Sequence, residues 1–348
     1  MHKISDPSNE LKTTGDARIN VWDGWRGLAI FLVLTGHFYD IKWLWEDRMG
    51  VDVFFVLSGM LMSTILFDKR LSLKDFYIRR LSRIFPVLFV YVISIYTLSW
   101  AQSLNFSSSE VISSLFFLRT YYPEEPGIWS SQVAIGHLWS LNVEEHAYIL
   151  LSLLTFVFVN RKYTGLLLLL LGCGSIGLSY YQFSSLQPEE FKLHLIRTES
   201  AIVFIFFSAG YGLLKRQAGW VAHPTVTFLC ILGAVLCYAE GMPVWLIFAV
   251  SPLLLSVAVN HLENLPKSLN WVLSQAPLRY IGIYSYSIYI WQQFFYEYSW
   301  AFPIPKLIVA LLAIAVGILS YHMLENPARR FINSRWSANP TYKHTDKE

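Results

Sequence analysis

The sequence predicts an all-α integral membrane protein, a bundle of about ten transmembrane helices. Of its 348 residues, 54% are apolar and only 15% are charged, whereas a soluble globular chain averages about 25% charged residues. Several apolar runs are about 17–20 residues long, the length that an α-helix needs to cross the hydrocarbon core. The 13 Trp and 20 Tyr residues suit the aromatic belts that form at the two membrane interfaces.

Each predicted span is an apolar run bounded by charged or turn-forming residues. The predicted spans are 24–41, 50–67, 84–102, 138–159, 163–181, 199–215, 219–238, 242–259, 279–298 and 304–324. The first twenty residues are polar and hold no apolar signal-peptide core, so we expect the first span to direct insertion. We expect residues 1–23 and 329–348 to be short tails of one membrane domain at 24–328, with no further domain.

Basic residues fall on one side of the membrane if there are ten spans. They gather between the second and third spans, between the fourth and fifth, after the sixth, and in the C-terminal tail. Because cytoplasmic loops are enriched in Lys and Arg, both termini are predicted to be cytoplasmic. The stretch 68–83 is expected to form a basic amphipathic helix, for which anchoring to anionic lipid is one reading.

His37 lies near the outer end of the first predicted span, and Asp52 lies near the outer start of the second. A short loop joins the two spans, so both residues sit at one depth and could be in contact. A carboxylate that orients a histidine fixes its tautomer and makes it a general base. The alternative is an interfacial histidine beside a helix-capping aspartate, and the spacing leaves both readings open.

The fourth predicted span carries two adjacent carboxylates, Glu144 and Glu145, about two turns after His137. His137 and Glu144 are seven residues apart and share a helix face. Ionisable groups inside a span are costly and mark candidate functional sites, although a buried ion pair that holds helices together is the alternative for Glu145. At least one carboxylate needs a partner, and the candidates are Arg26, Arg197 and His146.

Arginines gather where the first span meets the predicted inner face. Arg26 stands at this mouth, with Arg79, Arg80 and Arg83 close by. Guanidinium groups suit a multiply charged phosphate ligand, and they equally suit lipid headgroups. For Glu325, at the inner end of the last span, we expect a structural pair with a cytoplasmic arginine.

Six short motifs follow one another along the chain. They are Arg26-Gly27-Leu28 with His37 eleven residues after Arg26, Gly50 to Gly59, Arg79 to Pro86, His137 to Glu145, Ser285 to Tyr289, and Glu325-Asn326-Pro327. Because the motifs occur in this order and on this number of spans, the chain resembles the membrane-bound acyltransferase family 3. Members of this family are bacterial O-acyltransferases that modify surface polysaccharides. It departs from the family pattern at Asn142, His146 and Gln292, where Ser, Gln and His are usual.

The resemblance implies an enzyme of the bacterial inner membrane that transfers an acyl group. The donor would be cytoplasmic acetyl-CoA, and the acceptor a hydroxyl of a cell-surface or lipid-linked polysaccharide such as the O-antigen of lipopolysaccharide. The implied catalytic residues are His37, Asp52 and Glu144. The residues implied for acyl-CoA binding are Arg26, Arg79, Arg80 and Arg83, and those for the substrate pocket are His137, Trp139, Ser58 and Glu145.

Two other functions stay open at this stage. One is an acyltransferase that acts on a small molecule, and the other is a transporter or flippase that uses the same buried charges. Transporters often carry internal repeats and broken helix pairs, and neither is clear in this sequence. Membrane lipids are expected neighbours, whereas no nucleic acid and no metal are expected, since the cysteines at 173, 230 and 237 have no metal-ligand spacing.

Overall fold

The computed structural model describes residues 7–39, 41–123, 128, 132–157, 161–183, 185–186, 194–299 and 304–337. Within these ranges the chain forms helices and loops and no β-strand, so the predicted all-α class is confirmed. The helices are α1 (Pro7–Phe38), α2 (Glu46–Ser63), α3 (Leu73–Ala101), α4 (Ser108–Leu115), α5 (Trp139–Val157), α6 (Arg161–Phe183), α8 (Thr198–Ala218), α9 (Pro224–Cys237), α10 (Trp245–Ala249), α11 (Ser251–Asn260), α12 (Lys267–Leu273), α13 (Ala276–Glu297), α14 (Lys306–Ser320) and α15 (Asn326–Trp336). Two π-helical turns, η1 (Thr64–Asp68) and η5 (Tyr321–Glu325), continue α2 and α14, and 3₁₀ turns lie at η2 (Gly136–Leu138) and η3 (Leu262–Asn264).

The helices have the apolar character of a membrane protein. Among the described residues, four are long and apolar enough to cross a bilayer by length and composition: Glu46–Asp68, Leu73–Ala101, Lys162–Gln182 and Lys306–Trp336. Each of the other predicted spans also coincides with helical residues. Helices α5, α8 and α13 have 19, 21 and 22 residues but carry more polar side chains, so the number of ten spans stays a prediction.

Several helix boundaries differ from the predicted ones. Helix α1 begins at Pro7, so the predicted tail runs without a break into the first span. The stretch 68–83 is not a separate helix, because α3 begins at Leu73, after the side chain of Ser72 caps it, and continues through Pro86 to Ala101. The predicted span 242–259 is broken into α10 and α11 at Val250, next to a proline at the start of α11 that cannot donate a backbone hydrogen bond.

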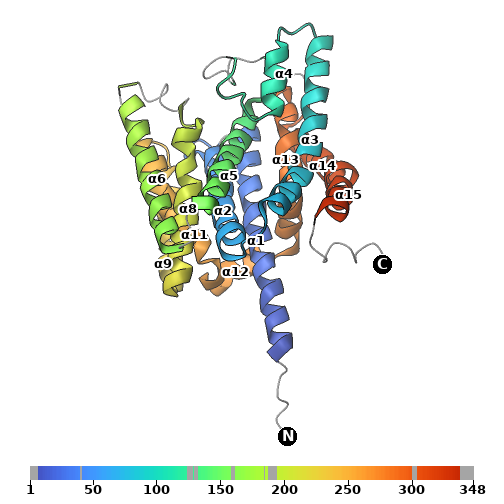
Figure 1. The fold of residues 1–348 in the computed structure, drawn as a ribbon. Helices are drawn as coiled ribbons and strands as arrows, with labels where there is room; N and C mark the ends of the chain where they lie inside the picture. Colours follow the sequence, from blue (N-terminus) through green and yellow to red (C-terminus); the bar gives the residue numbers. More distant parts are fainter. Residues whose placement is uncertain are drawn as a thin grey trace.

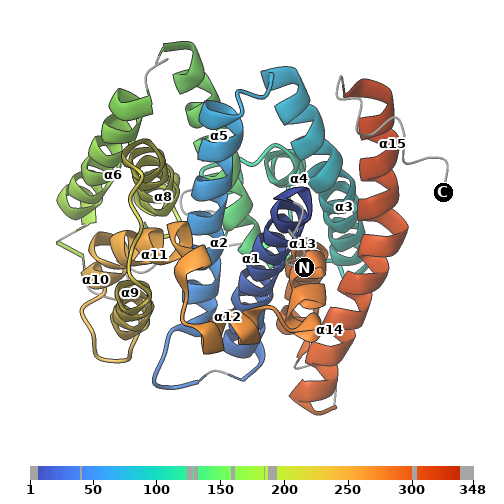
Figure 2. The ribbon, with the colours of Figure 1, turned by 90° about the horizontal axis from the view of Figure 1, so that it is seen from below.

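Helix α1 occupies the centre of the bundle. It packs against α2 on one side and α13 on the other. The flank beyond α2 is formed by α6, α8, α9 and α11, and the opposite flank is formed by α3, α14 and α15 (Figures 1 and 2). A Cβ atom at Gly282 of α13 would lie 1.8 Å from the carbonyl oxygen of Asp23 on α1. Only glycine permits this approach of two helix backbones, and it brings the polar side chains of α1 and α13 together.

Candidate active site

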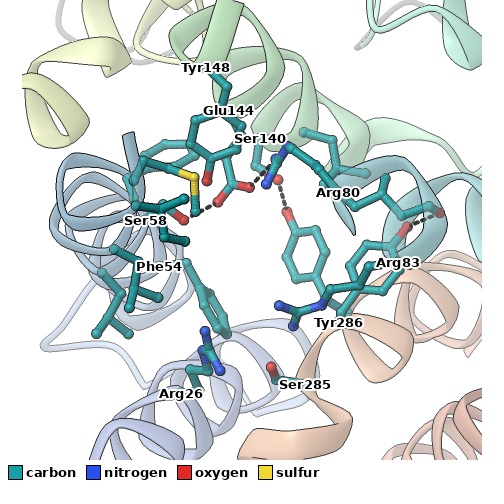
Figure 3. A pocket seen from close by; sticks show the side chains of 18 of the residues that line it. Arg26, Phe54, Ser58, Arg80, Arg83, Ser140, Glu144, Tyr148, Ser285 and Tyr286 are labelled. Atoms are coloured by element: carbon teal, nitrogen blue, oxygen red, sulfur yellow. Dashed lines mark hydrogen bonds and ion pairs between the residues drawn. The ribbon is translucent and has the colours of Figure 1, made fainter. Parts of the chain in front are cut away.

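A cavity of about 240 Å³ lies among α1, α2, α3, α5 and α13 (Figure 3). Apolar side chains of α2, including Phe54 and Leu61, line part of its wall. The polar lining residues are Arg26, Ser58, Arg79, Arg80, Arg83, Ser140, Glu144, Tyr148, Ser285, Tyr286 and Tyr289. Pockets for drug-sized ligands usually measure about 300–1,000 Å³, so this cavity suits one end of a long ligand rather than the whole of it.

Arg80 is the partner of both adjacent carboxylates. Its Nε lies 2.5 Å from Oε1 of Glu145, and its Nη2 lies 3.0 Å from Oε2 of Glu144. Its guanidinium lies 3.5 Å above the centroid of the Tyr148 ring. The planar guanidinium presents two edges, so one side chain reaches two carboxylates that point in different directions from α5.

The shared partner of these carboxylates is Arg80 and not one of the expected candidates, Arg26, Arg197 and His146. Arg197 pairs with Glu199 at 2.5 Å, and Nδ1 of His146 lies 2.7 Å from Oγ1 of Thr198. The contacts of Arg80 with Glu144 and Glu145 could not be inferred from the spacing of residues, because Arg80 lies on α3, more than 60 residues earlier in the chain. Glu145 thus lies in the buried ion pair that was the alternative for this residue, and it is not among the side chains that line the cavity.

Hydroxyl groups extend the polar network along the cavity. Oγ of Ser58 donates to Oε1 of Glu144 at 2.8 Å, so this carboxylate is held from both α2 and α3. Oγ of Ser140 lies 2.7 Å from the hydroxyl of Tyr289. That hydroxyl donates to the backbone carbonyl of His137 at 2.9 Å, and it thereby links α13 to the turn η2 that precedes α5.

Arg26 and Arg83 both line the cavity, and their partners are more distant than those of Arg80 (Figure 3). Nη1 of Arg26 lies 3.3 Å from Oδ1 of Asp23, and Nε of Arg83 lies 3.6 Å from Oε1 of Glu325. The second pair confirms the arginine partner expected for Glu325. Because these contacts are long and each guanidinium makes up to five N–H donations, both arginines retain donors for an anionic ligand.

His37 contacts α13 and the start of α2. Its Nδ1 lies 2.7 Å from Oε1 of Gln292, its ring stacks on Tyr296 with centroids 4.5 Å apart, and its Nε2 lies 3.9 Å from Oδ2 of Asp47. The carboxylate that faces His37 is thus Asp47 and not Asp52, which corrects the expected contact. A helix turns by about 100° per residue, so a step of five residues places Asp52 about 140° round α2 from Asp47.

Asp52 is instead fully buried in an ion pair within α2. Its Oδ2 accepts from Nε of Arg48 at 2.8 Å and from the hydroxyl of Tyr238 at 2.8 Å. Nη1 of Arg48 donates to the carbonyl oxygen of Leu195 at 3.0 Å. These bonds join α2 to the segments before α8 and after α9, so this set of residues is placed to hold helices together.

Trp139 begins α5, His137 lies in the turn η2 just before it, and both are buried. The guanidinium of Arg48 lies 5.0 Å from the centroid of the Trp139 ring. The His137 ring contacts Tyr91 and Tyr289, with centroids 5.3 and 5.4 Å away. Neither residue lines the cavity, whereas Ser58 and Glu144, which also belong to the predicted site, do line it.

One face of α13 connects the cavity to His37. Ser285 and Tyr289 line the cavity, and Gln292 and Tyr296 contact His37. Their spacing of four, three and four residues is that of one helix face. Gln292 and Asp47 were missed as site residues, although this spacing, continued from the Ser285–Tyr289 motif, was a signal for Gln292.

Metal-ligand groups were sought across the described ranges. There, no group of three or more His, Cys, Asp or Glu side chains lies close enough to hold a metal ion. The cysteines at 173, 230 and 237 are free thiols. The polar groups that the fold does bring together around the cavity and His37 are guanidiniums, carboxylates, hydroxyls and amides.

Comparisons with known proteins agree with this arrangement. Residues 19–324 match a family model described as an acyltransferase domain. The chain is 27% identical to the Bacillus subtilis protein YrhL, provisionally named a peptidoglycan O-acetyltransferase, over 88% of this chain and 54% of that protein. It is 26% identical to the peptidoglycan O-acetyltransferase OatA of Listeria monocytogenes over 89% of this chain and 56% of that protein, and 26% identical to the O-acetyltransferase OatA of Staphylococcus aureus, over 88% and 57%.

The chain therefore spans about half the length of the curated relatives that it matches. The matched part covers nearly all of this chain, including every helix that lines the cavity. No solved structure matches the chain.

Proposed function

Because the chain belongs to acyltransferase family 3, we propose that it is a membrane O-acetyltransferase that moves an acetyl group from acetyl-CoA to a hydroxyl of a cell-surface polysaccharide. The observation that carries this proposal is the face of α13 that joins an arginine-lined cavity to His37. Arg26 and His37 are eleven residues apart on α1, which is about 16 Å along the helix axis. A long, phosphate-bearing donor and a separate acceptor can meet over such a distance.

The donor would enter by the arginines. Arg26 and Arg83 keep N–H groups for phosphate oxygens, and Arg79 lines the same cavity. Arg80 already pairs with Glu144 and Glu145, so we assign it to holding these carboxylates rather than to phosphate binding. The cavity would hold the narrow acetyl-pantetheine end of the donor, with the nucleotide end near the mouth.

His37 would act as the general base. Its Nε2 takes the proton of the acceptor hydroxyl, the hydroxyl oxygen attacks the thioester carbonyl carbon, and the carbon–sulfur bond breaks. The coenzyme A thiolate leaves and takes up the proton, so that the products are an O-acetyl ester and free thiol. A general base of this kind contributes about 10²–10⁴ in rate. Tyr289 lines the cavity, and its ring lies 5.4 Å from that of His137, which interacts electrostatically with His37.

The acceptor follows from chemistry that the relatives' names suggest. Two of them are named as acting on peptidoglycan, so we propose a cell-wall polysaccharide as the first acceptor to test, with O-antigen as the second. A bacterial inner-membrane location with ten spans and both termini in the cytoplasm would place the arginine mouth on the acetyl-CoA side.

The test is acetyl transfer by the purified protein in liposomes. With acetyl-CoA and a glycan acceptor, the wild-type protein should release free thiol and form an acetylated glycan, and His37→Ala should lower the rate by about 10²–10⁴. Mass spectrometry of cell-wall and lipopolysaccharide glycans from cells with and without the gene identifies the acceptor. Solute movement without acetyl transfer, unchanged in His37→Ala, would contradict the proposal.

A further inference from the structure

A chain of side-chain amides on α13 ends at His37. The carboxylate of Glu297 accepts from Nε2 of Gln293 at 2.7 Å, and Oε1 of Gln293 lies 3.5 Å from Nε2 of Gln292. Oε1 of Gln292 lies 2.7 Å from Nδ1 of His37. Gln292 and Gln293 are both buried, so the contact between them is shielded from water, whereas Glu297 at the end of the chain of amides is exposed.

The carboxylate at one end sets the direction of the amides. An ionised carboxylate only accepts hydrogen bonds, so Gln293 must turn its NH₂ group to Glu297 and its oxygen to Gln292. Gln292 in turn directs its NH₂ group to Gln293 and its oxygen to His37. An amide oxygen cannot donate, so the proton on the His37 ring must lie on Nδ1.

We propose that Gln292 is a positioning residue that holds His37 in the Nδ1-protonated tautomer, so that Nε2 is the atom that takes the proton of the acceptor. This inference rests on the proposed acetyl transfer. A carboxylate in this position would also supply charge, whereas the glutamine amide fixes only the tautomer and the ring orientation. The charge comes from the other side, where Asp47 faces Nε2.

The groups around the ring divide these tasks. Asp47 of α2 lies 3.9 Å from Nε2, so it favours the imidazolium that forms when Nε2 accepts a proton. Tyr296 of α13 stacks on the ring, and among the described residues the His137 ring, before α5, also interacts with it electrostatically. The hydrogen bond between Nδ1 and Gln292, at 2.7 Å, is shorter than the contact with Asp47.

Two substitutions at position 292 separate positioning from packing. Gln292→Met fills the same space but cannot accept a hydrogen bond from the N–H group at Nδ1 of His37. We expect kcat to fall about 10- to 100-fold, with little change in KM for acetyl-CoA. Gln292→Glu restores an acceptor and adds charge. It should retain much of kcat, while the acid limb of its pH–rate profile moves up by about 1–3 units, because a carboxylate beside the ring favours the imidazolium.

The control is Asn333→Leu on α15. Asn333 is also a buried amide, and its Oδ1 accepts from Oγ of Ser82 at 3.3 Å, far along the chain from His37. We expect this variant to keep the wild-type kcat and pH profile. Protein amount in the membrane and the unfolding temperature are measured for all variants, so that rates refer to folded protein.

The outcomes are distinct. If wild-type protein transfers no acetyl group, the proposed function has failed. If it transfers acetyl and His37→Ala does not, then a Gln292→Met variant with the wild-type rate would overturn the positioning role. If Gln292→Met does not accumulate, Gln292→Glu decides alone, and an unshifted acid limb in that variant overturns the inference.

Discussion

The guanidinium of Arg48 lies 2.8 Å from the carboxylate of Asp52, one turn along α2, and both side chains are buried. Two charges that share one helix face in this way are structural, because each would otherwise be uncompensated in an apolar interior. The aspartate that faces His37 is Asp47, at the start of the same helix. The same change of aspartate to asparagine should therefore affect stability at position 52 and catalysis at position 47.

Asp52→Asn should destabilise the protein and leave the chemistry intact. Removal of one partner from a buried ion pair costs about 3–5 kcal/mol, so we expect a lower unfolding temperature and less protein in the membrane. The rate per folded molecule should stay within about twofold of wild type. Thermal unfolding in detergent and acetyl transfer at matched amounts of folded protein measure both effects.

Asp47→Asn should do the reverse. Its side chain is 35% exposed, so the loss of its charge should cost less than about 1 kcal/mol of stability. Without this carboxylate the imidazolium that forms during transfer loses a neighbouring negative charge, so the rate of acetyl transfer per folded molecule should fall below that of wild type. A wild-type rate in Asp47→Asn together with a lowered rate per folded molecule in Asp52→Asn would contradict the assignment of these two residues.

Arg80→Met should be among the most damaging single substitutions in the site. It leaves Glu144 and Glu145 adjacent, largely buried and without their shared cation, which we expect to cost about 3–5 kcal/mol. The triple variant with Glu144→Gln and Glu145→Gln should recover much of this stability, since the carboxylates are then neutral. Unfolding temperatures of the single and triple variants test this coupling. An equal decrease in unfolding temperature in both variants would exclude it.

Arg26→Gln and Arg83→Gln should weaken donor binding. A hydrogen bond to a charged group contributes about 1.5–3 kcal/mol, so KM for acetyl-CoA should rise by about tenfold or more in each variant, with a smaller change in kcat. Arg335→Gln is the matched control, because Arg335 is an exposed arginine of α15. Steady-state kinetics over a range of acetyl-CoA concentrations distinguish the two groups, and an unchanged KM in both cavity variants would remove the arginines from donor binding.

Gly282→Ala should separate α1 from α13. Its Cβ would lie 1.8 Å from the carbonyl oxygen of Asp23, so the helices must move apart, at a cost of about 1–3 kcal/mol or more. The contact between His37 and Gln292 crosses the same interface, and acetyl transfer should fall with stability. Gly174→Ala is the control, since a Cβ there meets nothing within 4 Å and alanine favours the helix.

Much of the fold could be predicted because its signals are local. The all-α class follows from long apolar runs, and the predicted spans coincide with helices except where caps and prolines set the ends. Ser72 caps α3, so this helix begins before the apolar run that defined the predicted span at 84–102. At Val250 one predicted span is divided into α10 and α11. These differences arise from backbone hydrogen bonding, which hydropathy does not measure.

The candidate site was predictable in its members more than in its contacts. Arg26, Ser58 and Glu144 were expected from their motifs, and they line one cavity. Arg80 was expected to bind a ligand, yet it pairs with two carboxylates. Gln292 was noticed only as a departure from the family pattern, because glutamine carries no charge that would mark it as costly inside a membrane.

By itself, the sequence determined that this is a helical membrane protein of acyltransferase family 3 and which titratable residues its helices carry. Apolar length and motif order are properties of the linear chain, so they need no packing to be read. Only the tertiary structure decided that Asp47 rather than Asp52 faces His37, and that Gln292 accepts a hydrogen bond from it. The reason is geometric: each residue turns a side chain by about 100° around its helix, and the neighbours that it then meets come from helices far away in the sequence.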